Sequence, residues 1–241
     1  MFRFLKPILV ATVTTLIGAA CQPTPLAPEE SQVNPENWPL EKPVMVHDAD
    51  MEQRIVELMA RMTLEEKVGQ VMQADINEVT PEQVRELNLG SVLNGGNSAP
   101  DKNLRNTPDS WLALADEFWE ASTDTSAGGV GIPAIWGTDA MHGHSNVVGA
   151  TLFPHNIGLG AANDPDLMYE IGRVTSLEML ATGLDWTFAP TVAVVRNDRW
   201  GRTYEGYSED PRIVATYAPR IVEGIQGKLG TDEFLDENRM I

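Results

Sequence analysis

Two short stretches of the sequence gather side chains that could do chemistry. The first, residues 137–146, carries one carboxylate, Asp139, directly after the apolar residues 132–136. A carboxylate can accept hydrogen bonds from two neighbouring hydroxyls of a sugar ring, and such charge-assisted bonds are among the stronger ones. The alternative is that Asp139 caps its own loop. Its position after an apolar run, where α/β barrels keep their active sites, favours binding.

The same stretch contains a His-x-His pair, His142 and His144. Two histidines on one face of a strand can hold a metal ion. No third ligand is evident, however, and Gly137 and Gly143 indicate a loop in place of a strand. We therefore predict histidines that hydrogen-bond to the backbone, with no metal and no cofactor.

The second stretch, residues 196–211, contains three arginines, four carboxylates and three aromatic residues. Aromatic faces stack on sugar rings, and guanidinium groups donate hydrogen bonds to hydroxyls. The alternative is an internal ion-pair network that stiffens the loop. Both can hold, because a binding arginine needs further side chains to fix it. Paired carboxylates can also serve acid–base catalysis, but the spacing of Glu205 and Glu209 does not favour them as a catalytic pair.

Helices and strands that would position these stretches alternate along the chain. One apolar helical face is predicted near residues 55–62, and a capping box of Thr63 and Glu66 begins the next helix. We expect that second helix to bury its apolar side chains, which are Leu64, Val68, Val71 and Met72.

Further helices are expected where a capping residue precedes proline, at Thr80, Thr107 and Asp164, and over residues 211–225. Strands are expected at residues 91–93, 132–138 and 186–194, the last interrupted by Pro190. Strands that alternate with helices predict an α/β fold with a parallel sheet.

The C-terminal residues 236–241 resemble a turn followed by the start of a strand at Arg239. A domain does not normally stop while entering a strand, and about three earlier strands are too few to close a parallel barrel. We therefore expect a partial (β/α)8 TIM-type barrel, its first half only, truncated before closure.

Composition and charge narrow the range of partners. With 42% hydrophobic and 22% charged residues, the chain has the composition of a folded globular protein. Its net charge of −18 would repel polyanions, so nucleic acid and anionic lipid surfaces are poor partners. Neutral ligands such as sugars are not repelled, although acidity alone does not select them.

The N-terminus has the pattern of an export signal. Arg3 and Lys6 precede an apolar stretch and small residues, which predicts a signal peptide over residues 1–20. The alternative is a buried N-terminal helix. Cys21, the only cysteine, occupies the cleavage point and is a candidate for lipidation, although Gly18 and Ala20 also suit ordinary signal peptidase. We expect a Pro-rich tether over residues 21–47, a folded domain over 48–241, and a periplasmic, outer-membrane or secreted location.

Several blocks together resemble glycoside hydrolase family 3, in its branch of β-glucosidases and exo-1,3/1,4-β-glucanases. They are residues 62–70, 137–144, 149–156, 199–202 and 208–211. The resemblance implies the N-terminal part of an eight-stranded barrel, and a separate α/β sandwich domain in the parent protein. It also implies retaining hydrolysis that releases glucose from non-reducing ends of β-glucans or β-glucosides.

The resemblance also implies roles for individual residues. Asp139 and Arg202 would bind the hydroxyls of the terminal glucose, with Arg199, Glu205 and His144 as supporting residues. The family's Lys-His pair, its Ser-Asp-Trp stretch with the nucleophile, and the acid/base glutamate have no counterpart in these 241 residues. The sequence therefore predicts no catalytic residue in this chain and no activity of the chain alone.

The sequence is also compatible with two other hypotheses about the function. A non-catalytic carbohydrate-binding lipoprotein would use Asp139 and Arg202 without any hydrolysis. A metalloprotein would use the His142–His144 pair. The expected partners in the favoured reading are β-linked glucose oligosaccharides or polysaccharides, with a lipid anchor at Cys21 as a candidate membrane attachment.

Overall fold

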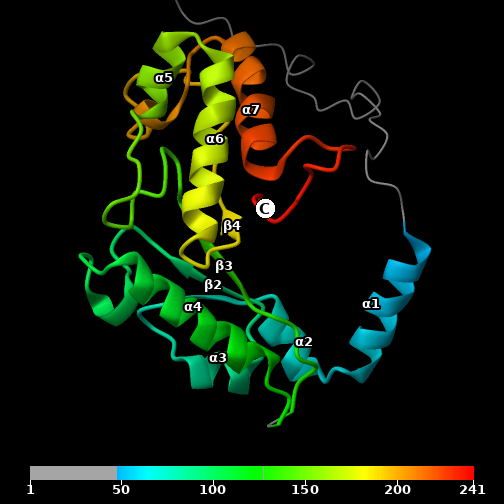
Figure 1. Cartoon of the computed structure of the whole chain (residues 1–241). Coiled ribbons are helices and arrows are strands. Elements are labelled where there is room, and N and C mark those ends of the chain that lie inside the picture. Colours follow the sequence, from blue (N-terminus) through cyan, green and yellow to red (C-terminus); the bar gives the residue numbers. More distant parts are fainter. Residues whose placement is uncertain (1–47, 127) are drawn as a thin grey trace, which may run out of the picture. The chain divides into compact units, whose positions relative to one another are not determined.

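A computed structural model describes residues 48–126 and 128–241 (Figure 1). The expected signal peptide, the candidate lipidation residue Cys21 and the Pro-rich tether lie outside these described residues. Among the helices that are described, none combines the length and the apolar character needed to cross a membrane.

The described chain alternates between helices and short strands. The strands are β1 (Gln73–Asp75), β2 (Ser91–Asn94), β3 (Ile135–Thr138) and β4 (Trp186–Thr187). The helices are α1 (Ala49–Arg61), α2 (Leu64–Gln70), α3 (Pro81–Leu87), α4 (Pro108–Thr123), α5 (Asn156–Ala162), α6 (Pro165–Leu180) and α7 (Pro211–Gln226), with 3-10 turns η3 (Pro100–Lys102) and η4 (Thr203–Glu205).

All four strands form one parallel sheet in the order β1-β2-β3-β4. Val92 pairs with Trp136, and Thr138 pairs with Thr187. The predicted α/β fold with a parallel sheet is thereby confirmed. Because the strands are parallel, their carboxyl ends meet at one edge of the sheet.

Helix starts follow the predicted chemistry with one exception. Thr63 with Glu66 and Thr80 with Gln83 form complete capping boxes, and the Asp164 side chain accepts from the N–H of Leu167. Helix α4 begins where predicted, with Thr107 at the N-cap position, but the Thr107 side chain makes no capping hydrogen bond. Pro108 favours this helix start, because its fixed φ suits the first helical position and it has no N–H that would be left unpaired there.

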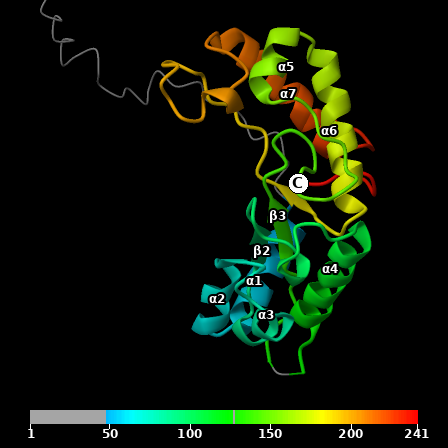
Figure 2. The same cartoon turned by 90° about the vertical axis from the view of Figure 1, so that its left-hand side faces the viewer.

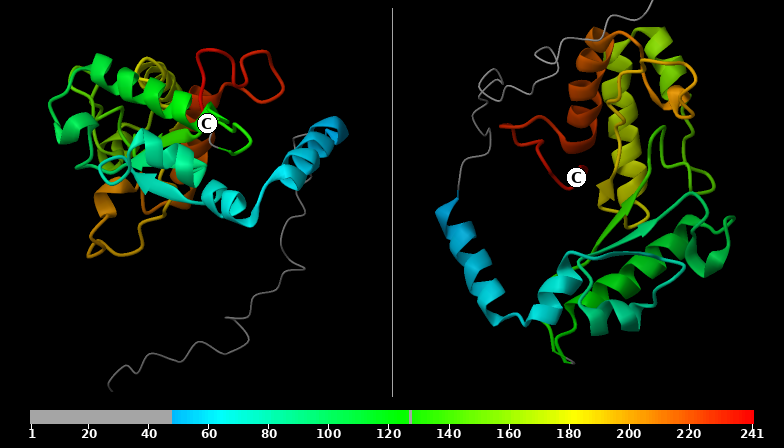
Figure 3. Two further views of the ribbon diagram at one scale, coloured as in Figure 1. Left: turned by 90° about the horizontal axis from the view of Figure 1, so that it is seen from below. Right: turned by 180° about the vertical axis from the view of Figure 1, so that it is seen from behind.

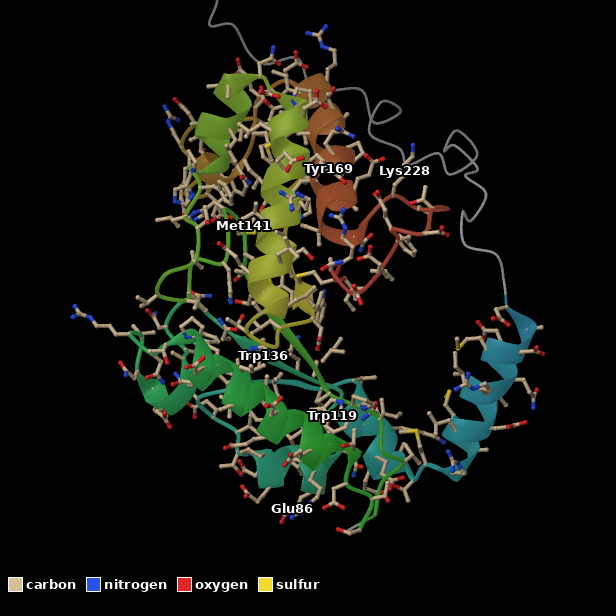
Figure 4. The ribbon with its side chains drawn as sticks, in the orientation of Figure 1. Glu86, Trp119, Trp136, Met141, Tyr169 and Lys228 are labelled. Carbon is tan, nitrogen blue, oxygen red and sulfur yellow. The ribbon has the colours of Figure 1, made fainter. Side chains whose placement is uncertain are left out.

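Helix α4 packs on the sheet through aromatic side chains. The indole of Trp136, on β3, stacks on Trp111 with ring centroids 5.7 Å apart, and its second neighbour is Phe118 at 5.6 Å. All three rings are buried. Trp136 is labelled in Figure 4 at the sheet, above α4. Aromatic packing of this kind removes large apolar areas from water and fixes the strand on its helix.

Helices α6 and α7 lie side by side (Figures 1 and 2) and approach closely at two glycines. A Cβ atom at Gly224 would lie 2.2 Å from the Tyr169 carbonyl oxygen, and one at Gly172 would lie 2.5 Å from the Ile221 carbonyl oxygen. Neither distance is possible for real atoms. The two helices therefore need glycine at this crossing.

Four elements, β1, α5, β3 and β4, differ from the expected ones. Strand β1 and helix α5 were not predicted. The strand expected over residues 186–194 is regular only at Trp186–Thr187, with one further ladder bond from the Phe188 N–H to the Thr138 carbonyl. Pro190 cannot donate a ladder hydrogen bond, which is consistent with the early end. The strand expected from residue 132 begins at Ile135.

The expected burial of the apolar face of α2 is wrong. Leu64 is 73% exposed and Val71 is 85% exposed, and Val68 and Met72 are exposed as well. Helix α2 packs through a different side, where Gly69 is buried and its carbonyl accepts from the Gly90 N–H. No described element covers the apolar face. The apolar face of α1 is likewise exposed, at Ile55 and Met59.

The last residue makes strand-like contacts beside β4. Ile241 donates its N–H to the Asp185 carbonyl and accepts from the Thr187 N–H, which is the bonding pattern of a parallel ladder. Figure 3 shows the segment after α7 returning to this position. The strand expected to start at Arg239 is therefore not formed, and only Ile241 makes ladder hydrogen bonds.

Candidate functional site

A buried polar network fixes the carboxyl ends of β2 and β3. Asn94 Nδ2 donates to Thr138 Oγ1 at 2.8 Å, and the Trp136 indole N–H donates to Asn94 Oδ1 at 2.9 Å. Asn146, from the loop after β3, also donates to Thr138 Oγ1 at 3.1 Å. Buried polar groups need such partners, so this network ties the loop after β3 to the ends of β2 and β3.

Asp75, at the carboxyl end of β1, fixes the loop after β2. Its carboxylate accepts from Ser98 Oγ at 2.6 Å and from the backbone N–H of Gly95 and of Asn77. This holds Gly96 at the edge of the pocket described next. Asp75 was not predicted because β1 was not, and a three-residue strand carries almost no periodic signal.

Asp139 follows β3 directly and lies in a pocket with a volume of about 330 Å³. That volume is at the lower end of the usual range for small-ligand sites. Asp139 is exposed, and its carboxylate accepts no hydrogen bond from any described residue, so the alternative of a loop cap has no support. Its neighbours around the pocket are Gly96, Met141, His142, Ser145, Asn146, His155, Arg202, Tyr204 and Glu205. Met141 is labelled in Figure 4.

Arg202 reaches the same pocket from the loop before η4 and is paired with Glu205. Arg202 Nε lies 2.9 Å from both Glu205 carboxylate oxygens, and Nη2 lies 2.5 Å from Oε2. The expected internal ion pair is therefore present. Hydrogen bonding to Glu205 raises the pKa of Arg202, with smaller contributions that include the charge of Asp139. Arg202 Nη1 has no partner among the described residues and can donate to a ligand.

Helix α5 fixes the other side of this ion pair. Asn156 Nδ2 donates to the Glu205 carbonyl oxygen at 2.7 Å. Gly160 lies so close to Tyr207 that a Cβ atom there would be 1.7 Å from the Tyr207 carbonyl oxygen. The Glu205 carboxylate is held ionised, because the hydrogen bonds from Arg202 lower its pKa. Helix α5 was not predicted, because its glycine-rich stretch has no amphipathic pattern.

The two histidines of the His-x-His pair have separate environments. His142 Nδ1 lies 3.1 Å from the Phe153 carbonyl oxygen, as expected for a histidine bonded to the backbone. His144 is fully buried, and its Nε2 lies 2.9 Å from Thr182 Oγ1, a side chain and not the backbone. Burial lowers the pKa of His144 to about 4. Within residues 48–126 and 128–241, no group of His, Cys, Asp or Glu gathers that could hold a metal ion.

The remaining candidates of the arginine-rich stretch do not line this pocket. Arg199 is exposed, and only its backbone is fixed, by the Asn197 side chain. Glu209 lines a neighbouring pocket of about 440 Å³ together with Arg196 and Asp198. The structure thus brings Asp139, Arg202 and Glu205 together, and it leaves Arg199, Glu209 and the buried His144 outside the pocket.

Comparison with known proteins identifies the relatives of this chain. Residues 63–236 match the model of the glycosyl hydrolase family 3 N terminal domain. A lysosomal beta glucosidase of Dictyostelium discoideum is 32% identical over 185 residues, which cover 70% of this chain. A periplasmic beta-glucosidase of Salmonella typhimurium is 29% identical over 185 residues, or 75% of this chain.

Among solved structures, the exo-1,3/1,4-beta-glucanase of a Pseudoalteromonas species is similar over 87% of this chain, with 54% identity and a TM-score of 0.81. The chain spans 22% and 21% of the lengths of the two curated relatives and 26% of that solved chain.

Proposed function

Because the chain belongs to glycosyl hydrolase family 3, we propose that its described part is the sugar-binding portion of a β-glucosidase or exo-β-glucanase. The parent reaction is the retaining hydrolysis of β-glucosidic bonds, which releases glucose from non-reducing ends. The names of the three relatives support this reaction class and its β-linked glucose substrates.

The observation that carries the proposal is the shared pocket of Asp139 and Arg202. Asp139 offers a carboxylate that accepts no hydrogen bond within the described residues, and Arg202 offers its Nη1 donors. One group accepts from sugar hydroxyls while the other donates to them. Both bonds are charge-assisted, and Glu205 and Asn156 hold Arg202 in place beforehand. The site needs no metal or cofactor for this binding.

We propose further that the four-stranded sheet is the first half of a (β/α)8 barrel. The parallel order of the strands and the ladder bonds of Ile241 beside β4 support this reading. In the family, the nucleophile and the acid/base glutamate belong to blocks that these 241 residues do not contain. We therefore expect the chain alone to bind sugar without hydrolysing it. Release of nitrophenol from an aryl β-glucoside by the pure chain would contradict this expectation.

We propose that the protein is exported. The pattern of residues 1–20 favours a signal peptide, and Cys21 is the residue that would carry a lipid. The names of the two curated relatives, one periplasmic and one lysosomal, support a compartment outside the cytoplasm. A sugar-binding lipoprotein without a hydrolase parent gains no support from these names, because all three relatives are named as hydrolases.

Direct sugar binding tests the proposed function. We expect methyl β-glucoside and laminaribiose to bind the purified chain, as measured by ligand-observed NMR. The variant Asp139→Asn should weaken binding by about tenfold or more, since hydrogen bonds to a charged group contribute about 1.5–3 kcal/mol. Asp232→Asn, at an exposed carboxylate in the loop after α7, is the matched control and should bind like the wild type. The proposal fails if the wild type does not bind, or if Asp139→Asn binds equally well.

A further inference from the structure

The three aromatic residues of the arginine-rich stretch have different surroundings. Tyr207 is 2% exposed and packs against Tyr217 in the core. Trp200 is partly exposed but does not line the pocket of Asp139. Tyr204 is 44% exposed and lines that pocket together with Arg202. Of these three rings, Tyr204 alone offers an aromatic surface beside the groups that would hold sugar hydroxyls.

Two imidazole rings pack against Tyr204. The His155 ring meets the Tyr204 ring edge to face, with centroids 4.9 Å apart and an interplanar angle of 86°. His142 lies behind His155, with centroids 4.2 Å apart, and is tied to the Phe153 carbonyl. We define Tyr204, His155 and His142 as the aromatic column. It spans η4, the residue before α5 and the loop after β3, so three separate segments fix one exposed ring.

We propose that Tyr204 is the surface on which the pyranose ring of the ligand packs, and that His155 is the positioning residue that holds Tyr204 in place. This inference rests on the proposed function and names a further determinant of specificity at the same site. An all-equatorial pyranose such as a β-glucoside presents C–H bonds on both faces of its ring. An aromatic face can cover that apolar surface while Asp139 and Arg202 bind the hydroxyls at the ring edge.

Tyr204 supplies an apolar contact that Asp139 and Arg202 lack. Asp139 and Arg202 recognise hydroxyls but offer no apolar surface to the ring. A flexible tyrosine would lose rotamer freedom on binding, whereas a ring already packed against His155 loses less. The aromatic column therefore makes Tyr204 a rigid contact. We expect ligands with an axial hydroxyl on the packed face to bind more weakly than β-glucosides.

The test compares Tyr204 variants with a control at another exposed ring. We expect Tyr204→Ala to weaken methyl β-glucoside binding about three- to tenfold, and Tyr204→Phe to stay within about twofold of the wild type. Trp119→Ala removes a 58% exposed ring on α4 that does not line this pocket, and it should bind like the wild type (Figure 4). Saturation transfer from tyrosine ring protons to axial sugar protons should be strong in the wild type.

Wild-type affinity in Tyr204→Ala would overturn the proposal, provided that Asp139→Asn has lost affinity in the same assay. That pattern leaves the proposed function intact. Absence of sugar binding by the wild type would instead refute the proposed function together with this inference. If Tyr204→Ala unfolds, as seen by circular dichroism, Tyr204→Leu replaces it, because leucine retains apolar volume without an aromatic face. Equal affinity of Tyr204→Leu and the wild type would also overturn the proposal.

A double-mutant cycle tests the positioning role of His155. His155→Phe preserves an aromatic contact and should retain affinity, whereas His155→Ala should weaken binding about two- to threefold. In a Tyr204→Ala background, His155→Ala should cause no further loss, because the ring that it positions is gone. Additive losses would show that His155 acts independently of Tyr204 and would overturn its positioning role.

Discussion

The Arg202 guanidinium and the Glu205 carboxylate form a bidentate ion pair. Arg202 Nε lies 2.9 Å from both carboxylate oxygens, and Nη2 lies 2.5 Å from Oε2. The Arg202 side chain remains 62% exposed, whereas that of Glu205 is only 14% exposed. Glu205 is the anchored member, since its carbonyl is bound by Asn156 on α5. The pair therefore fixes the guanidinium on its Nε side and leaves Nη1 for a ligand.

Removing the charge of Glu205 should loosen Arg202. We expect Glu205→Gln to weaken β-glucoside binding about three- to tenfold, because a planar guanidinium loses its bidentate partner. Ligand-observed NMR at pH 7 measures the effect. Glu209→Gln is the matched control, since Glu209 is exposed and lies outside the pocket. Wild-type affinity in Glu205→Gln, or an equal loss in Glu209→Gln, would contradict a positioning role.

Replacing Asn94 should destabilise the fold. Asn94 is fully buried and bonds both to Trp136 and to Thr138. Asn94→Ala leaves the buried indole N–H of Trp136 without its partner and removes one of the hydrogen bonds to Thr138 Oγ1, so we expect the free energy of unfolding to fall by about 2–3 kcal/mol. Urea unfolding followed by tryptophan fluorescence measures this change. Asn97→Ala, at an exposed position of the next loop, should change stability by less than about 0.5 kcal/mol. Equal stabilities of the two variants would refute the role of the network.

Buried His144 should make stability depend on pH. Its pKa is lowered to about 4 from an ordinary value of 6.5, because burial penalises the charged form. The unfolded chain therefore takes up a proton first. The stabilisation is complete above pH 6.5 and is lost as the pH falls from 6.5 towards 4, by about 3 kcal/mol in total.

The measurement is the free energy of unfolding between about pH 7 and pH 4.5 for the wild type and for His144→Gln. The variant should have the shallower slope, because glutamine does not titrate. Burial also lowers the pKa of His142, whose contribution has the same sign and remains in both proteins. Identical slopes in the two proteins would show that His144 is not the titrating group.

The crossing of α6 and α7 should tolerate only glycine at Gly224. A Cβ atom there meets the Tyr169 carbonyl, so we expect Gly224→Ala to reduce the free energy of unfolding by about 1–3 kcal/mol. Gly158→Ala, within α5, is the control: its Cβ would lie 3.6 Å from the nearest atom, Pro154 Cβ. That change should be neutral or stabilise by about 0.5–1 kcal/mol. Thermal denaturation ranks the two variants, and the reverse order would contradict the close packing.

Local chemistry allowed much of the fold to be predicted. The capping box at Thr63 and the caps at Thr80 and Asp164 are each encoded within four residues, so they could be predicted without a structure. The alternation of helices and strands along the chain predicted the parallel sheet. Strand β1 and helix α5 were missed because three residues, or a run rich in glycine, carry too little periodicity to detect.

Burial of the apolar face of α2 was not predictable from its spacing. Periodicity shows that Leu64, Val68 and Val71 share a face, but it does not show what lies opposite that face. In the structure, Gly69 provides the contact with the turn before β2, and the apolar face stays exposed. The same limit applied to His142 and His144, since a spacing that permits metal binding does not fix where the rings point.

The sequence by itself determined which residue types could hold a sugar, and its ordered motifs identified the family. Only the tertiary structure decided which of them meet: Asp139 follows β3 and Arg202 lies far later in the chain, yet both line one pocket. It also excluded Arg199 from that pocket and selected Tyr204 over Trp200 and Tyr207. The physical reason is that the parallel sheet brings strand ends together and α5 anchors the arginine loop, and both contacts join residues distant in sequence.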